Sequence, residues 1–158
     1  MPDLFYSIIV FIFGTIVGSF LNCVIYRLEQ GQSFLKGRSY CPHCKHTLSW
    51  QDLIPVLSFL FLKGKCRYCH QKISWQYPLV EIFTGLLFLS IFNFQFSILN
   101  EFSIFQFSKL FYYFLISSFL IIIFVYDLKH YIIPDKIIYP AIIVSGIWYL
   151  VASIFFNF

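Results

Sequence analysis

Four long apolar stretches, separated by polar segments, dominate the 158-residue chain. They run over 4–26, 78–99, 110–126 and 137–156. A helix needs about 20 apolar residues to cross the hydrocarbon core of a bilayer, and these stretches have about that length. The pattern therefore predicts an all-α polytopic membrane protein with about four transmembrane helices.

The composition supports this interpretation. Hydrophobic residues make up 59% of the chain and charged residues only 11%, whereas soluble domains are about 25% charged. The lipid bilayer is therefore the expected partner. The net charge of +4 is too small and too unevenly spread to indicate a nucleic-acid partner.

The positive charge gathers in one polar region, residues 27–77, which holds eight Lys or Arg but only two acids. We expect three parts: a first transmembrane helix (1–26), this polar region, and a transmembrane bundle (78–158). Lys and Arg favour the cytoplasmic side, so the polar region should be cytoplasmic and both termini outside. Within the region, the apolar segment 52–62 is too short to span and should lie on the membrane surface or pack on the second span.

Two cysteine pairs in the polar region carry the clearest chemical signal. They are Cys41-Pro42-His43-Cys44 and Cys66-Arg67-Tyr68-Cys69, and the surrounding sequence repeats at an offset of 25 residues. Two such turns supply the four soft ligands of a tetrahedral zinc site, so we predict structural zinc on Cys41, Cys44, Cys66 and Cys69. The alternatives are two disulfides, four idle buried thiols or a membrane thiol oxidoreductase. A reducing cytoplasm disfavours the disulfides and the oxidoreductase.

The first two spans carry polar or small residues that need an explanation. Gly14 and Gly18 lie on one helix face, where they would allow a neighbouring helix to approach closely. Asn22 would need a hydrogen-bonding partner at its depth. Glu81 is either a carboxylate stabilised at the N-terminus of the second span or a functional acid facing the bundle interior.

Two aspartates flank the short loop between the third and fourth spans. Asp127 lies at the C-terminal end of a helix, where the helix dipole disfavours an anion, and a carboxyl placed against this preference suggests a function. Its ordinary alternative is an interfacial acid paired with Lys129. Asp135 follows Pro134 and precedes a helix, so N-capping is its expected role. An aspartic protease needs two carboxyls that share a proton.

Together these motifs resemble bacterial prepilin leader peptidases. The similar segments are 18–28, 41–58, 64–81 and Asp127 with 133–135. The resemblance implies a GxGD-type aspartic peptidase of the inner membrane that cuts the basic leader from type IV prepilins or pseudopilins at the cytoplasmic face. It also implies the settings of type IV pili, type II secretion or competence. Many members with the four-cysteine region also methylate the new N-terminus with S-adenosylmethionine.

By this resemblance Asp127 is the first catalytic aspartate, and Asp135 is a motif residue with a supporting role. Glu29, Asp52 and Glu81 are candidates for attracting the basic leader. The second catalytic aspartate of the family lies in a Gly-x-Gly-Asp motif, and no two of the seven glycines here are separated by a single residue.

We therefore expect the N-terminal part of such an enzyme, inactive alone and completed by a separate C-terminal half or a homo-oligomer. The alternative is a non-catalytic, zinc-stabilised membrane module that binds leaders or complements another chain.

Overall fold

The computed structural model describes residues 4–33, 37–98 and 104–156, and within them the chain is mainly helical. The elements are α1 (Leu4–Glu29), the 3₁₀ helix η1 (Trp50–Leu53), α2 (Leu57–Phe61), α3 (Gln76–Ile98), α4 (Ile104–His130) and α5 (Asp135–Phe156). The described residues form no β-strand, only two isolated β-bridges. The predicted all-α class is confirmed.

Four helices, α1, α3, α4 and α5, are long and apolar enough to cross a membrane, as the hydropathy pattern predicts. Several of these helices extend beyond the ends of the predicted spans. The expected loop 127–136 shrinks to 131–134, and the expected loop 100–109 is already helical from Ile104; residues 100–103 lie outside the described residues. A helix satisfies its own backbone groups, so it continues through the interfacial polar residues at which the hydropathy pattern stops.

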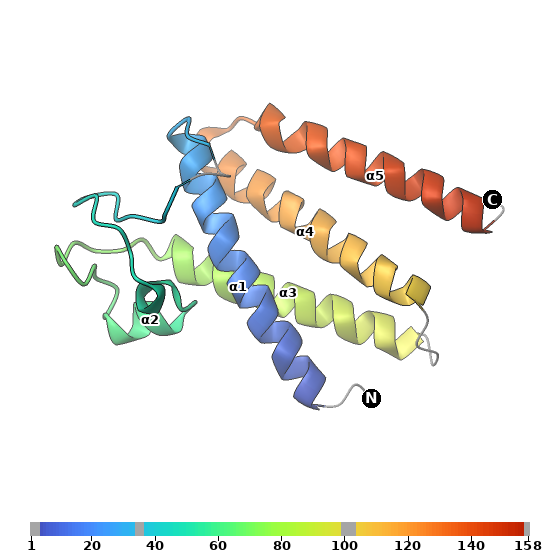
Figure 1. Ribbon diagram of the computed structural model, residues 1–158, viewed down its shortest axis with the longest axis horizontal. Helices are drawn as coiled ribbons and strands as arrows, with labels where there is room; N and C mark the ends of the chain where they lie inside the picture. The colour runs from blue at the N-terminus through green and yellow to red at the C-terminus, as the bar shows by residue number, and fades with distance from the viewer. Residues whose placement is uncertain (1–3, 34–36, 99–103, 157–158) are drawn as a thin grey trace.

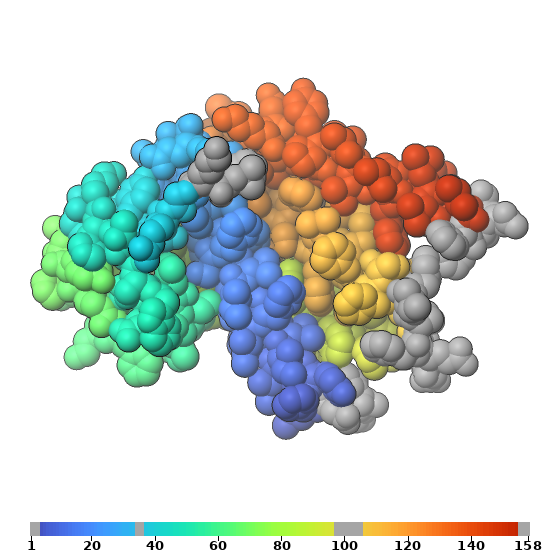
Figure 2. All heavy atoms as spheres, in the orientation of Figure 1, coloured from blue at the N-terminus to red at the C-terminus, as the bar shows by residue number. Residues whose placement is uncertain are grey.

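The region between α1 and α3 forms a small lobe, and we call residues 37–75 the cap. Figure 1 shows the cap at the end of the bundle where α1 ends and α3 begins. Both chain ends lie away from it, toward the opposite end of the bundle. The space-filling view in Figure 2 shows the cap abutting α1 and leaving α5 uncovered.

The α1–α3 pair is the tightest contact in the bundle. A Cβ atom added at Gly14 would lie 2.7 Å from the Cα of Gly85, and one added at Gly18 would lie 2.7 Å from the Cα of Glu81. Real Cβ atoms do not approach other atoms that closely, so only glycine permits this crossing. The prediction that Gly14 and Gly18 admit a neighbouring helix is confirmed.

The remaining helices pack less completely. A buried apolar cluster joins α1 and α3 to one side of α4 and to the start of α5, where Ile137 lies. Beyond that contact most of α5 is exposed. Pro140 lies in the second turn of α5, because the helix begins at Asp135, two residues before the expected start of the fourth span.

Candidate metal centre and the adjacent cavity

The two cysteine pairs are held in hairpins of the same backbone form. In the first hairpin (39–48), the amide of Cys41 donates to the carbonyl of His46, and the amide of Leu48 donates to the carbonyl of Ser39, both at 2.9 Å. The second hairpin (64–73) repeats both bonds at positions 25 residues further on. The sequence repeat is therefore a structural repeat, and each copy turns two sulfurs inward.

The four sulfurs of Cys41, Cys44, Cys66 and Cys69 converge on one point, with every Sγ within 4.8 Å of the others. All four cysteines are free, and the Sγ atoms of Cys41 and Cys69 lie 3.8 Å apart. Four sulfurs bound tetrahedrally at 2.3 Å from one ion would be about 3.8 Å apart, whereas a disulfide bond is about 2.05 Å long. The arrangement fits a four-thiolate metal site and not a pair of disulfides.

The pKa of Cys69 reflects how closely the four thiols are packed. The backbone amide of Gln71 lowers the pKa of the Cys69 thiol, but partial burial and the neighbouring thiols of Cys66, Cys44 and Cys41 raise it to about 11. Crowded thiols resist losing several protons together, because the resulting thiolates repel one another. A bound metal ion removes that repulsion, so the set of four is chemically suited to one.

Asp52 connects the two hairpins through a carboxylate that is only 4% exposed. It accepts hydrogen bonds from the amide and hydroxyl of Ser49 at 3.1 and 2.8 Å. It also accepts from Nε of Arg67 at 2.7 Å and from the hydroxyl of Tyr68 at 3.2 Å. Burial raises the pKa of this carboxyl, but the bonds from Ser49, Arg67 and Tyr68 outweigh it and hold the pKa below its usual value. Arg67 and Tyr68 are the two residues between the cysteines of the second pair, so Asp52 orients that turn.

Glu81 joins the bundle to the cap. It lies five residues into α3, in the second turn rather than at the helix N-terminus, because α3 begins earlier than expected. Its Oε2 accepts a hydrogen bond from the amide of Val56 at 2.7 Å, just before α2. Val56 has φ +60°, which is unfavourable for a β-branched residue. Glu81 therefore faces inward and stabilises the strained entry to α2.

Asn22 has the hydrogen-bonding partner expected for a polar side chain inside a span. Its side chain is 2% exposed, and its Nδ2 donates to the carbonyl of Tyr77 at 3.0 Å. That carbonyl and Pro78 both lie in the first turn of α3. The bond fixes the start of α3 against α1.

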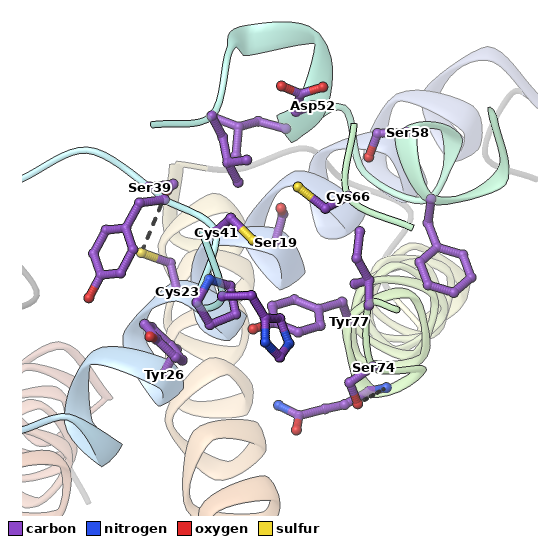
Figure 3. A pocket seen from close by; sticks show the side chains of 18 of the residues that line it. Ser19, Cys23, Tyr26, Ser39, Cys41, Asp52, Ser58, Cys66, Ser74 and Tyr77 are labelled. Atoms are coloured by element: carbon purple, nitrogen blue, oxygen red, sulfur yellow. Dashed lines mark hydrogen bonds between the residues drawn. The ribbon is translucent and has the colours of Figure 1, made fainter. Parts of the chain in front are cut away.

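A cavity of about 380 Å³ lies between the cap and the ends of the helices. Figure 3 shows Ser19, Cys23 and Tyr26 from α1 around it, together with Cys41 and Cys66 from the cap. At its rim, Nζ of Lys129 from α4 lies 2.8 Å from Oε1 of Glu29 from α1.

The acids expected to attract a basic leader all line this cavity, but each is already engaged within the protein. Glu29 pairs with Lys129, Asp52 with Arg67, and Glu81 with the amide of Val56. Sequence reasoning missed these roles because each partner is 15 or more residues away along the chain.

The two aspartates of the third and fourth spans lie apart from the cavity. Asp127 is an exposed residue in the last turn of α4. Its expected alternative role as partner of Lys129 is wrong, because Lys129 pairs with Glu29. Asp135 is also exposed. It is the first residue of α5, and the carbonyl of Pro134 accepts the first helical bond, from Ile138 at 3.2 Å. Pro134 therefore occupies the position before the helix that Asp135 was expected to hold.

Comparison with known proteins gives matches that include the cap and the helices on either side of it. The profile of the bacterial peptidase A24 N-terminal domain matches residues 12–94. The chain is 44% identical over 85 residues to a prepilin leader peptidase/N-methyltransferase of Myxococcus xanthus, covering 54% of this chain and 25% of that protein. It is 41% identical over 130 residues to the protein of that name from Bacillus subtilis, covering 82% of this chain and 49% of that protein. No solved structure matches the chain significantly.

The chain spans between a quarter and about half the length of these curated relatives. The profile match covers more than half of the chain and includes both glycines of α1, all four clustered cysteines, and Asn22 and Glu81. The chain therefore belongs to the bacterial A24 peptidase family and corresponds to the N-terminal part of its prepilin peptidases.

Proposed function

We propose that this chain is the N-terminal part of a prepilin leader peptidase/N-methyltransferase of the bacterial inner membrane. The observation that carries the proposal is the match to the Bacillus subtilis protein of that name. Because it covers 82% of 158 residues, any placement of the match includes the four cysteines and Asp127. The basic residues of 27–77 put the cap in the cytoplasm and both termini outside.

In this function the cap is a structural zinc domain built on Cys41, Cys44, Cys66 and Cys69. Zinc suits four thiolates in tetrahedral geometry and supplies the charge that lets them come together. We keep the expected division of the chain into a first helix (1–26), a zinc-binding region (27–77) and a membrane bundle (78–158).

For peptide cleavage, Asp127 supplies one carboxyl of the acid pair, and Asp135 is a supporting residue of the same motif. Two carboxyls are needed so that one activates water and the other protonates the departing group. We propose that another chain supplies the second carboxyl, either a separate C-terminal half or a second copy of this chain. The helix end that carries Asp127 suits a prepilin, in which a short basic leader meets an apolar helix at the membrane face.

For methyl transfer, the cavity beside the cap is the candidate site for S-adenosylmethionine. Its volume of about 380 Å³ falls within the range of small-molecule sites. Tyr26 and Tyr77 line it and offer aromatic surface for an adenine ring.

The test is leader cleavage in vesicles, with a type IV prepilin as substrate. We expect no cleavage by the 158-residue chain alone. We expect cleavage when it is co-expressed with a C-terminal segment of a relative that carries Gly-x-Gly-Asp, and its loss with Asp127→Asn. Lys136→Gln, a change at an exposed residue in the first turn of α5, is the matched control and should leave cleavage intact.

Two outcomes would overturn parts of this proposal. Cleavage by the chain alone that Asp127→Asn abolishes would show that no second chain is required. Tight prepilin binding without cleavage under every pairing would favour the alternative, a non-catalytic zinc-stabilised module that binds leaders.

A further inference from the structure

The cap carries several exposed apolar side chains, which we call the cap face. Phe61 is 82% exposed, Trp50 72% and Trp75 69%, and Leu57 and Leu60 of α2 are also exposed. These side chains come from η1, from α2 and from the residue before α3. Burying such a patch is strongly favourable, so we ask what covers it.

The bond between Glu81 and Val56 gives the depth of this face. Glu81 lies five residues after the start of α3, which is about 7.5 Å along the helix axis. The amide of Val56, immediately before α2, is 2.7 Å from the Glu81 carboxylate. The entry to α2 therefore lies beside the second turn of a membrane-spanning helix and not beyond its end.

Apolar side chains of α3 are exposed at that same depth. Leu79 and Phe83 are two residues on either side of Glu81 along α3, and both are exposed. α3 is long and apolar enough to span a bilayer. The cap face is therefore level with an exposed apolar surface of a candidate membrane span.

The composition of the face fits the boundary between headgroups and acyl chains. Trp75 directly precedes α3 and lies 4.9 Å, centroid to centroid, from Phe59, the one buried side chain of α2. Tryptophan is enriched at membrane interfaces. Lys63 and Lys65 follow α2 and are exposed, and long basic side chains can extend from an apolar surface to the headgroups.

We propose that this face of the cap, formed by Trp50, Leu57, Leu60, Phe61 and Trp75, inserts into the lipid leaflet on the cap's side of the membrane. The short helix α2 then lies at the interface with its apolar residues among the upper acyl chains. The proposal does not depend on the enzymatic function proposed above.

Tryptophan fluorescence can test this with the full chain in phosphatidylcholine–phosphatidylglycerol vesicles at low protein density. One variant keeps Trp50 alone, through Trp75→Phe and Trp148→Phe, and a second keeps Trp75 alone, through Trp50→Phe and Trp148→Phe. A control replaces all three tryptophans by Phe and adds Gln30→Trp, at an exposed position just past α1. Metal content is measured for each variant to show that the cap has folded.

We expect lipids brominated near the headgroup to quench Trp50 and Trp75 strongly, while aqueous iodide quenches them weakly. The Gln30→Trp control should show the reverse order. Quenching of Trp50 and Trp75 by iodide as strong as that of the control would mean that water covers the face. Protection from both quenchers would mean that protein covers it, whether a second copy or another chain. Either result would overturn the proposal.

Discussion

The two cysteine hairpins share a backbone but differ in what surrounds them. Both repeat the same hydrogen bonds at an offset of 25 residues, and Lys45 and His70 take the same left-handed conformation at equivalent positions, with φ of 59° and 57°. After the first hairpin, Ser49 and Asp52 form a capping box at the start of η1. After the second, the chain passes directly into α3.

This difference shows that the hairpins are locally encoded but joined asymmetrically. Asp52 follows the first hairpin and bonds to Arg67 and Tyr68 in the second. His46 of the first hairpin also stacks on Tyr68, with ring centroids 3.7 Å apart. The position equivalent to Asp52 is Tyr77, which lies in α3 and contacts Asn22 of α1. The first hairpin and the residues after it therefore hold the second, while the second continues into the membrane bundle.

Loss of one ligand should have the largest effect, and it should be the same for either hairpin. We expect Cys41→Ser and Cys66→Ser each to release the metal and unfold both hairpins, because metal binding supplies folding energy of about 10 kcal/mol or more. The four spanning helices should remain inserted. Metal content and limited proteolysis of the cap measure this. A second hairpin that stays protected in Cys41→Ser would show that the two copies are stable separately.

Asp52→Asn should have an intermediate effect, because it removes the carboxylate charge from the hydrogen bond to Arg67, whose side chain is 45% exposed. Solvent screens such a pair, so it contributes about 0.5–1 kcal/mol, and metal loss to a chelator should become faster by about two- to fivefold. Arg67→Met should reproduce much of this effect, and the double variant should be little worse than either single change. If Asp52→Asn and the unmodified chain lose metal to the chelator at the same rate, the first hairpin does not stabilise the second through Asp52.

The contribution of Asp52 should not change with pH across the neutral range. Its pKa is lower in the folded protein than its ordinary value of 3.8, so its stabilisation is complete above the unfolded value and is lost only as pH falls through the folded one. The difference in chelator resistance between the unmodified chain and Asp52→Asn should therefore stay constant from about pH 8 to about pH 5. A difference that shrinks between those values would mean that the folded carboxyl has a raised pKa.

The smallest effect should distinguish the two left-handed residues. Glycine removes the steric cost of that conformation but loses more chain entropy, for a net gain of about 0.5 kcal/mol. We expect this gain for His70→Gly. We expect almost none for Lys45→Gly, because the Lys45 ammonium lies 5.3 Å from the ring centre of Tyr40 and losing this exposed contact costs about 0.5 kcal/mol. Chelator resistance compares the two, and equal gains would mean that the Lys45–Tyr40 contact is worth nothing.

Features that depend on local pattern could be predicted from the sequence. Hydropathy predicted four helices long enough to span a membrane, and the spacing of Cys41, Cys44, Cys66 and Cys69 predicted their convergence. Gly14 and Gly18 predicted a close helix contact, although not that Gly85 would face Gly14 and Glu81 would face Gly18. These features follow from periodicity and from turns of a few residues.

Features that depend on distant partners could not be predicted. Lys129 lies two residues from Asp127 but pairs with Glu29, 100 residues away. Asp52 and Glu81 looked like free acids available to a substrate, because nothing in the sequence shows which donor will fold against a carboxylate. The ends of the helices were also predicted incorrectly. The backbone is helical up to His130 and again from Asp135, although these polar residues lie outside the apolar stretches.

The hydrogen bond from the Val56 amide to Glu81 means that the cap depends on α3 for its complete folding. A peptide comprising residues 27–77 alone would lack the carboxylate that stabilises the entry to α2, so its second hairpin should lose part of its support even with metal bound. The lobe is therefore not a freely separable unit, and insertion of α3 should precede its final closure during synthesis.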